Sequence, residues 1–160
     1  MMPKLYLETS VISYLTARPS RDLILAAHQQ ITRDWWDFKR KNFQIFVSQL
    51  VIQEAGAGAG DSEAAQKRLQ ALENIPLLDL TQEVLALAKA LLDDGILPTR
   101  AKEDALHLAA AAVHKMDFLL TWNCRHIANP DILRRIILWH SDSSIHQFPV
   151  ICTPAEFFGE

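Results

Sequence analysis

The chain has 160 residues, a length that predicts one domain over residues 1–160 with a single core. Apolar residues make up 49% and charged residues 22%, which excludes a disordered or collagen-like chain. The formal net charge is −3, whereas domains that bind nucleic acid are usually basic. Any role on nucleic acid therefore requires a local site rather than the overall charge.

The pattern of apolar residues excludes a membrane-spanning segment, which needs about 18 consecutive apolar residues. Glu8 interrupts the apolar run near the N-terminus, so we see no signal peptide and expect a cytoplasmic protein with no membrane partner. Cys124 and Cys152 are too far apart for a Cys-x-x-Cys pair, so we interpret both as small core residues.

Short apolar runs rich in β-formers alternate with segments of helical periodicity along the whole chain. The first half is predicted to contain, in order, a strand over 4–8, a turn into a helix capped at Thr9 and Ser10, a long helix over 21–41, a strand over 43–48 and a helical turn carrying Glu54. The stretch 55–60 reads AGAGAG, and each glycine costs a helix about 1 kcal/mol relative to alanine. We expect a mobile loop there.

The second half continues this alternation. Its predicted elements, in order, are a helix from a cap at Asp61 to about 73, a strand over 75–80, a helix from a cap at Thr81 to a stop at Gly95, an alanine-rich helix over 101–114, a strand over 118–121, a helix from Pro130 to about 140, a strand over 150–153 and a final turn at 154–158. Most of the strands are continuously apolar, which is typical of a parallel sheet covered on both faces. We therefore predict a three-layer α/β/α fold with a mainly parallel, five-stranded sheet.

Oxygen-bearing side chains follow several predicted strands, at the carboxyl ends where parallel sheets bind ligands. Glu8 ends the first strand, Glu54 follows the second, Asp104 lies in the first turn of the alanine-rich helix, and Asn123 follows the fourth strand. Crowded carboxylates repel one another unless a cation lies between them. Oxygen ligands suit Mg²⁺ or Mn²⁺, whose usual chemistry is phosphoryl transfer or phosphodiester hydrolysis.

At these residues the sequence resembles the PIN-domain family of metal-dependent nucleases, which includes the VapC-type toxins. Four segments carry the resemblance: YLETSVISYL (6–15), VSQLVIQEAGAGAGD (47–61), ILPTRAKEDALHLAAAAVHKMDFLLTWNCRHIANP (96–130) and VICTPAEFF (150–158). The third is the most specific, because it joins an acid, an alanine-rich helix and LLTWN at a strand end.

The resemblance implies a Mg²⁺ or Mn²⁺ site made by Glu8, Glu54 and Asp104 with assistance from Asn123. It also implies cleavage of RNA by a metal-activated water, and a type II antitoxin as partner. The sequence departs from the family pattern at two positions, since Glu8 and Asn123 stand where the family usually has aspartate. Three carboxylates remain.

Further polar residues near these positions have candidate roles. Ser10 and Thr121 could donate supporting hydrogen bonds to the carboxylates or to the attacking water. Arg125 and His126 follow Asn123 at the mouth of the crevice, where a cation could meet a phosphate. Trp35 and Trp36 are adjacent on a helix and point about 100° apart, so they cannot share one face. We expect one of the two rings to lie at a homodimer or partner interface.

Two other functions fit parts of this pattern. A PIN-fold protein that lost catalysis through the changes at Glu8 and Asn123 would act as a binding or assembly module. A receiver-type phosphoacceptor also gathers carboxylates at strand ends, but it needs an acid pair after the first strand and a lysine after the last. Glu8 is followed by Thr9, and the last strand is followed by TPAE, which excludes this class.

Overall fold

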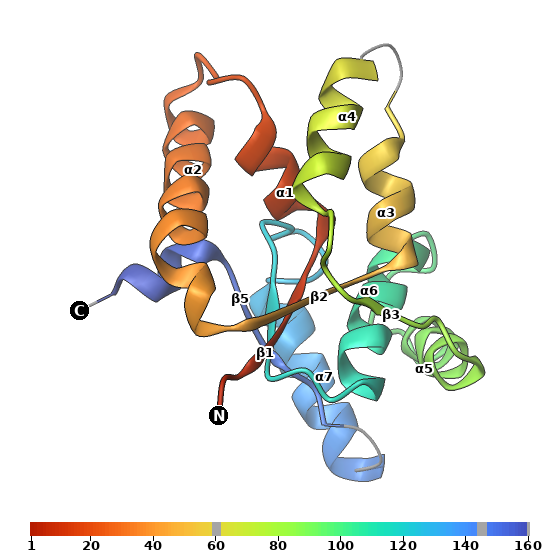
Figure 1. The fold of residues 1–160 in the computed structure, drawn as a ribbon. Coiled ribbons are helices and arrows are strands. Elements are labelled where there is room, and N and C mark those ends of the chain that lie inside the picture. The colour runs from red at the N-terminus through yellow and green to blue at the C-terminus, as the bar shows by residue number, and fades with distance from the viewer. Residues whose placement is uncertain (59–61, 144–146, 160) are drawn as a thin grey trace.

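The computed structural model describes residues 1–58, 62–143 and 147–159. Its centre is a five-stranded sheet of order β3-β2-β1-β4-β5 in which every pair is parallel (Figure 1). The strands are β1 (Lys4–Leu7), β2 (Gln44–Ser48), β3 (Leu77–Leu78), β4 (Phe118–Leu120) and β5 (Val150–Cys152). The predicted α/β fold with a parallel, five-stranded sheet is confirmed.

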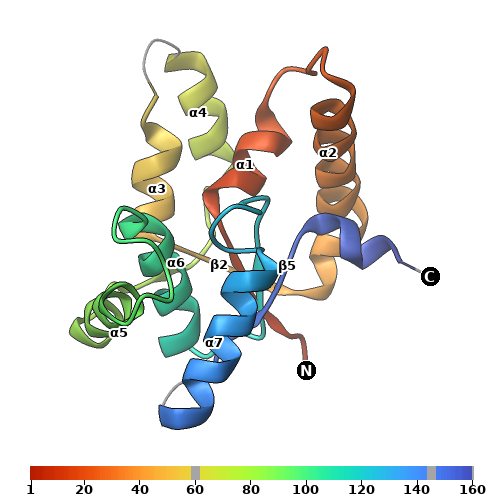
Figure 2. The same ribbon diagram turned by 180° about the vertical axis from the view of Figure 1, so that it is seen from behind.

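Helices connect the strands and cover the sheet. They are α1 (Thr9–Thr16), α2 (Leu23–Asp34), α3 (Gln49–Gly56), α4 (Ser62–Ala71), α5 (Gln82–Asp93), α6 (Lys102–Val113) and α7 (Pro130–Ser143). From β1 the chain moves one way along the sheet to β3, and it then returns past β1 to add β4 and β5. Right-handed crossovers put the helices of these two halves on opposite faces, and Figure 2 shows α6 and α7 in front of the strands.

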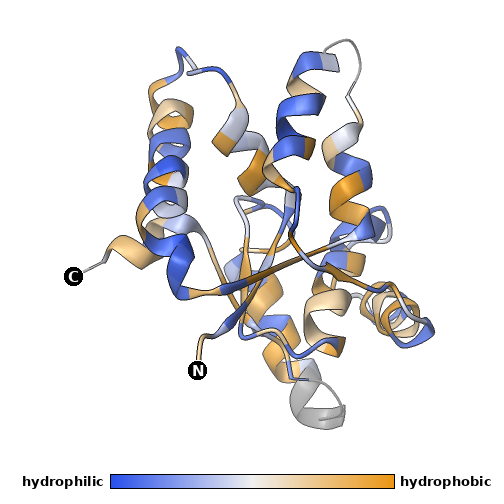
Figure 3. Ribbon diagram, in the orientation of Figure 1, coloured by the Kyte–Doolittle hydropathy of each residue, from blue (hydrophilic) through white to orange (hydrophobic). Residues whose placement is uncertain are grey.

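Strand β1 lies at the middle of the sheet and is the most deeply buried. Leu5, Tyr6 and Leu7 are each 0% exposed, because strands flank β1 on both edges and helices cover both faces. Helix α4 is the opposite case: none of its residues is buried, and Figure 3 shows it as mostly hydrophilic. Unlike α4, the carboxyl end of β1 lies among buried, closely packed neighbours.

The prediction of one long α-helix over 21–41 is wrong for the residues after Asp34. Helix α2 ends at Asp34, a π-helical segment, η1 (Trp35–Lys39), follows, and a 3₁₀ turn, η2 (Arg40–Asn42), leads into β2. The two adjacent tryptophan rings point in different directions and have different surroundings. Trp35 is 0% exposed and stacks with Phe43 at 6.0 Å, whereas Trp36 is half-buried beneath the guanidinium of Arg40 at 4.0 Å.

The loop predicted over 55–60 is wrong at its start, because Ala55 and Gly56 form the last turn of α3. Ala55 is fully buried, and Arg68 of α4 donates to the carbonyls of Ala55 at 2.8 Å and Ala57 at 3.0 Å. These bonds satisfy carbonyls that a helix end leaves unpaired, and they stabilise the turn despite its glycine. Residues 59 and 60 lie outside the described residues, as does the predicted cap at 61.

Two smaller boundaries differ from expectation. Strand β3 is only Leu77–Leu78, shorter at both ends than the predicted 75–80, and Pro76, which lacks an N–H for the ladder, accounts for its later start. Helix α1 is capped by Glu8 rather than by Thr9 or Ser10, since the Glu8 side chain accepts from the Ser10 amide.

The ends of α5 agree with the predictions. The Thr81 side chain accepts from the amide of Val84, and Gly95 follows the helix with a φ of +72°.

Within the described part of the chain, every helix is too short or too polar to span a bilayer.

Candidate active site

The carboxyl ends of β1 and β4 lie side by side at the point where the order of the strands reverses. After β1 the chain leads toward β2 on one side, and after β4 it leads toward β5 on the other. Open parallel sheets bind ligands in the crevice at such a switch point. The residues that follow β1 and β4 are therefore the first to inspect.

Glu8 follows β1 directly and is only 6% exposed. Its carboxylate accepts hydrogen bonds from the Ser10 amide at 3.1 Å, from the Ser10 hydroxyl and from the Thr121 hydroxyl. Among the described residues, no lysine, arginine or histidine forms an ion pair with Glu8. The structure therefore buries this carboxylate with neutral donors only, which solvate the charge but do not balance it.

Glu54 reaches the same place from the last turn of α3, and its side chain is 32% exposed. Its Oε1 accepts from the Thr9 hydroxyl at 2.6 Å and from Nε2 of His107 at 2.7 Å. Burial alone would raise the pKa of Glu54, but the hydrogen bonds that it accepts from His107 and Thr9 outweigh burial and hold this pKa below its ordinary value. Glu54 therefore stays ionised across the neutral range.

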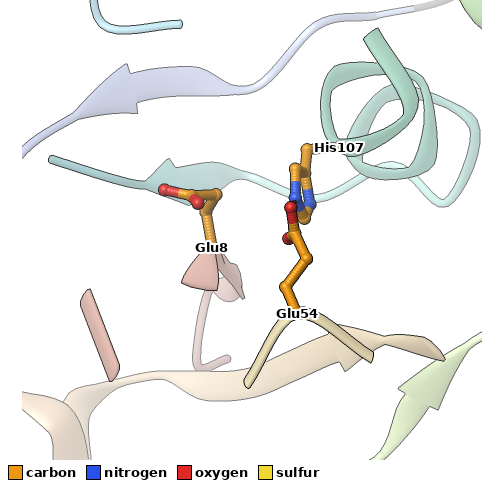
Figure 4. A group of neighbouring side chains, drawn as sticks. All are labelled: Glu8, Glu54 and His107. Carbon is orange, nitrogen blue, oxygen red and sulfur yellow. Dashed lines mark hydrogen bonds and ion pairs between the residues drawn. The ribbon is translucent and has the colours of Figure 1, made fainter. Parts of the chain in front are cut away.

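Glu8, Glu54 and His107 form one cluster, in which a ligand atom from each lies within 4.8 Å of those of the other two. Figure 4 shows the Glu54 carboxylate facing the His107 ring, with the Glu8 carboxylate beside them. His107 is 1% exposed, and its Nδ1 lies 2.6 Å from the Tyr6 hydroxyl. Burial raises the pKa of Tyr6, so its phenol keeps its proton. Two acids from distant parts of the sequence, Glu8 and Glu54, thus meet beside a buried imidazole.

Asp104 and Asn123 form an adjacent group with His126. Oδ1 of Asp104 accepts from the side-chain amide of Asn123 at 2.9 Å, and Oδ2 lies 2.8 Å from Nδ1 of His126. The side-chain Oδ1 of Asn123 accepts from the His126 backbone amide at 3.0 Å. Asp104 does not belong to the cluster of Glu8, Glu54 and His107, so the structure divides the four predicted residues between two neighbouring groups.

Thr121 connects the two groups, and Ser10 supports the first. The Thr121 hydroxyl donates to Glu8 and accepts from the backbone amide of Asn123 at 2.9 Å. The Ser10 hydroxyl donates to Glu8 and accepts from the Trp122 amide at 2.8 Å. Both predicted supporting residues therefore touch the buried carboxylate. Arg125 lies exposed in the turn after Asn123, near this edge of the sheet. Cys124 in the same turn is exposed as well, so its interpretation as a core residue is wrong, whereas Cys152 is buried.

The sequence analysis missed the roles of His107 and His126 in the two groups. His107 stands three residues after Asp104 in α6, and residues three apart share a helix face, so this spacing could have found it. His126 stands three residues after Asn123 in a turn, where sequence periodicity carries no such signal.

A divalent cation fits the donor set of this site. Oε2 of Glu54 has no hydrogen bond from the described residues, and Oε2 of Glu8 accepts only from a backbone amide there. Free carboxylate oxygens and an unbalanced buried charge suit Mg²⁺ or Mn²⁺. Glu8 and Glu54 would hold such an ion directly.

The comparisons with known proteins agree with this fold. A sequence model of the PIN domain matches residues 5–128. The crystal structure of VapBC2 from Rickettsia felis bound to a DNA fragment from their promoter is similar, with a TM-score of 0.57, 16% identity, and coverage of 93% of this chain and 97% of that chain. No curated protein matches the sequence. Because the matched segment holds most of the chain and both acidic groups, the protein belongs to the PIN-domain family.

Proposed function

We propose that this protein is a Mg²⁺- or Mn²⁺-dependent ribonuclease that hydrolyses RNA phosphodiester bonds. The observation that carries the proposal is the pairing of Glu8 with Glu54, two carboxylates brought within 4.8 Å beside a buried imidazole at the switch point of the sheet. Membership of a family of nucleases supports it.

The roles of the side chains follow from their positions. Glu8 and Glu54 would hold the divalent cation, which when bound supplies a Lewis acid and an activated water. Ser10 and Thr121 keep the Glu8 carboxylate fixed by donating to it, and Thr9 does the same for Glu54. Asp104, with Asn123 and His126, would form the second side of the crevice, and Arg125 would contact a substrate phosphate.

The test is cleavage of end-labelled RNA by the purified protein. We expect cleavage with Mg²⁺ or Mn²⁺, loss of cleavage with a chelator, recovery when the cation is restored, and products that carry a 5′-phosphate. Cleavage that persists in the chelator would contradict the proposal. The alternative, a PIN-fold binding or assembly module without nuclease activity, predicts no saturable Mn²⁺ binding in calorimetry.

Asp104 provides a second test of the site. The change Asp104→Asn removes a charge from the crevice while keeping the size of the side chain, and we expect RNA cleavage to fall at least about tenfold, as changes beside a metal site do. Asp131→Asn, an exposed position at the start of α7, is the matched control. Wild-type cleavage by Asp104→Asn would remove Asp104 from the site.

We also propose that the protein is the toxin of a type II toxin–antitoxin pair, acts in the cytoplasm and forms a homodimer. The similarity of its fold to a structure of VapBC2 supports this role. Expression of the chain in a bacterial culture is expected to stop growth, and expression of Glu54→Gln is not, because toxicity would require the intact site. Growth measured with and without co-expression of a candidate antitoxin tests that partner, and light scattering tests the dimer. Equal arrest by both forms would contradict the toxin role.

A further inference from the structure

A chain of hydrogen-bonded side chains runs from the core of the protein to Glu54. The Ser48 hydroxyl lies 2.8 Å from the Tyr6 hydroxyl, which lies 2.6 Å from Nδ1 of His107, and Nε2 of His107 lies 2.7 Å from Glu54. Ser48 and Tyr6 are 0% exposed and His107 is 1% exposed. These residues come from β2, β1, α6 and α3, so the chain joins four elements of the fold.

The hydrogens in this chain can be assigned by counting donors and acceptors. An ionised carboxylate only accepts, so the contact with Glu54 requires a hydrogen on Nε2 of His107. In a neutral ring Nδ1 then accepts from the Tyr6 hydroxyl, whose oxygen accepts in turn from Ser48. Every hydrogen is used once, and every donor points toward Glu54. Buried networks that are satisfied in this way are rigid.

His107 belongs to the cluster around Glu8 and Glu54, but its ring is not free to bind a metal ion. A metal ligand must offer a nitrogen lone pair, and in this structure Nε2 faces Glu54 while Nδ1 faces Tyr6. The two carboxylates, in contrast, keep oxygens with room for a further partner. The geometry therefore gives the imidazole a supporting role.

We propose that Ser48, Tyr6 and His107 form a positioning relay that orients the Glu54 carboxylate for a divalent cation, with His107 acting as a hydrogen-bond donor and not as a ligand. This inference rests on the proposed function, because it concerns the same site. Partners that hold a metal ligand in place typically change the affinity for the ion by 10- to 100-fold when removed. A hydroxyl in the core, away from the substrate, thus sets the affinity of the site.

The first experiment measures Mn²⁺ binding by calorimetry. Tyr6→Phe removes one hydroxyl and keeps the ring in the core, and we expect the Mn²⁺ dissociation constant to rise about tenfold. Tyr14→Phe makes the same change on α1, outside the chain of hydrogen bonds, and is expected to leave the constant unchanged. Circular dichroism spectra that match the wild type show that the variants are folded. Wild-type affinity in a folded Tyr6→Phe would overturn the relay.

Substitutions at His107 distinguish three roles for its ring: a hydrogen-bond donor to Glu54, a metal ligand, or a group that only fills space. His107→Gln keeps an N–H that can reach Glu54, so we expect Mn²⁺ affinity within a few-fold of the wild type. His107→Leu fills the space without a donor, and we expect a 10- to 100-fold loss. Pulsed electron paramagnetic resonance of bound Mn²⁺ is expected to show no directly bonded nitrogen. A directly bonded nitrogen, or equal affinities for the two variants, would overturn the proposal.

A final measurement needs no metal ion. Long-range ¹H–¹⁵N NMR of the cation-free protein reports which ring nitrogen of His107 carries hydrogen, and the signals are assigned by their loss in His107→Gln. We expect a protonated Nε2, and a bare Nε2 would overturn the relay alone. No saturable Mn²⁺ binding by the wild type would instead overturn the proposed function and, with it, the role of the relay.

Discussion

Changing Glu54→Gln should reduce RNA cleavage at least about 100-fold while leaving the fold intact. Oε1 of Glu54 accepts both hydrogen bonds that the described residues donate to this side chain, from Thr9 at 2.6 Å and from His107 at 2.7 Å. A glutamine can place its carbonyl oxygen at the same position and keep both bonds. Its amide nitrogen would then occupy the place of Oε2, the oxygen that we assign to the cation.

The expected size of this loss follows from the role of the charge. Lewis-acid stabilisation by a bound cation is worth several kcal/mol in the transition state, and each 1.36 kcal/mol changes a rate about tenfold. RNA cleavage and Mn²⁺ calorimetry on the same preparations measure the two effects. Glu73→Gln, an exposed position after α4, is the matched control. If Glu54→Gln cleaved RNA and bound Mn²⁺ like the control, Glu54 would not be a ligand.

Trp35 is where we expect the largest loss of stability. The ring is 0% exposed and lies among Phe43 and Phe157, at centroid distances of 6.0 Å and 6.3 Å. Trp35→Ala leaves a large cavity, and such changes typically lower the free energy of unfolding by about 3–5 kcal/mol. Urea unfolding followed by circular dichroism measures this difference.

A second substitution at Trp35 tests the physical reason. Nε1 of Trp35 is buried without a hydrogen-bond partner in the described part of the protein. Trp35→Phe keeps most of the apolar volume and removes this unpaired N–H, which itself costs about 1–3 kcal/mol. We therefore expect Trp35→Phe to be clearly more stable than Trp35→Ala. Equal destabilisation by both changes would show that ring volume is not what Trp35 contributes.

The sequence predicted strands and helix ends well where these depend mainly on neighbouring residues. The apolar run that forms β1 lies between neighbours that bury it completely, so pattern and tertiary structure agree. Thr81 and Gly95 mark the ends of α5 as predicted, because caps depend on neighbouring residues only. The π-helical segment that begins at Trp35 was not predicted, and the contact of this ring with Phe157, far along the chain, is one that no local pattern records.

The sequence predicted which residues gather at the candidate site better than it predicted which of them bond to one another. Strand ends placed Glu8, Glu54, Asp104 and Asn123 at one edge, where all four are found. They fall into two groups because the ring of His107 bonds to Glu54 and the ring of His126 bonds to Asp104. Such choices between partners follow from side-chain packing across α3, α6 and the turn after β4, and no local pattern records them.

The alternation of side chains along β1 has a consequence for how the site forms. Tyr6 and Glu8 are two residues apart in extended backbone and so project to the same side, while Leu5 and Leu7 project to the other. The pairing of Tyr6 with Phe46 on one edge and Leu119 on the other fixes both polar side chains at once. A slip of one residue would exchange them for leucines and bury charge in the wrong layer. A folded protein with a slipped β1 would therefore lose the Glu8 carboxylate and the Tyr6 hydroxyl from the site together.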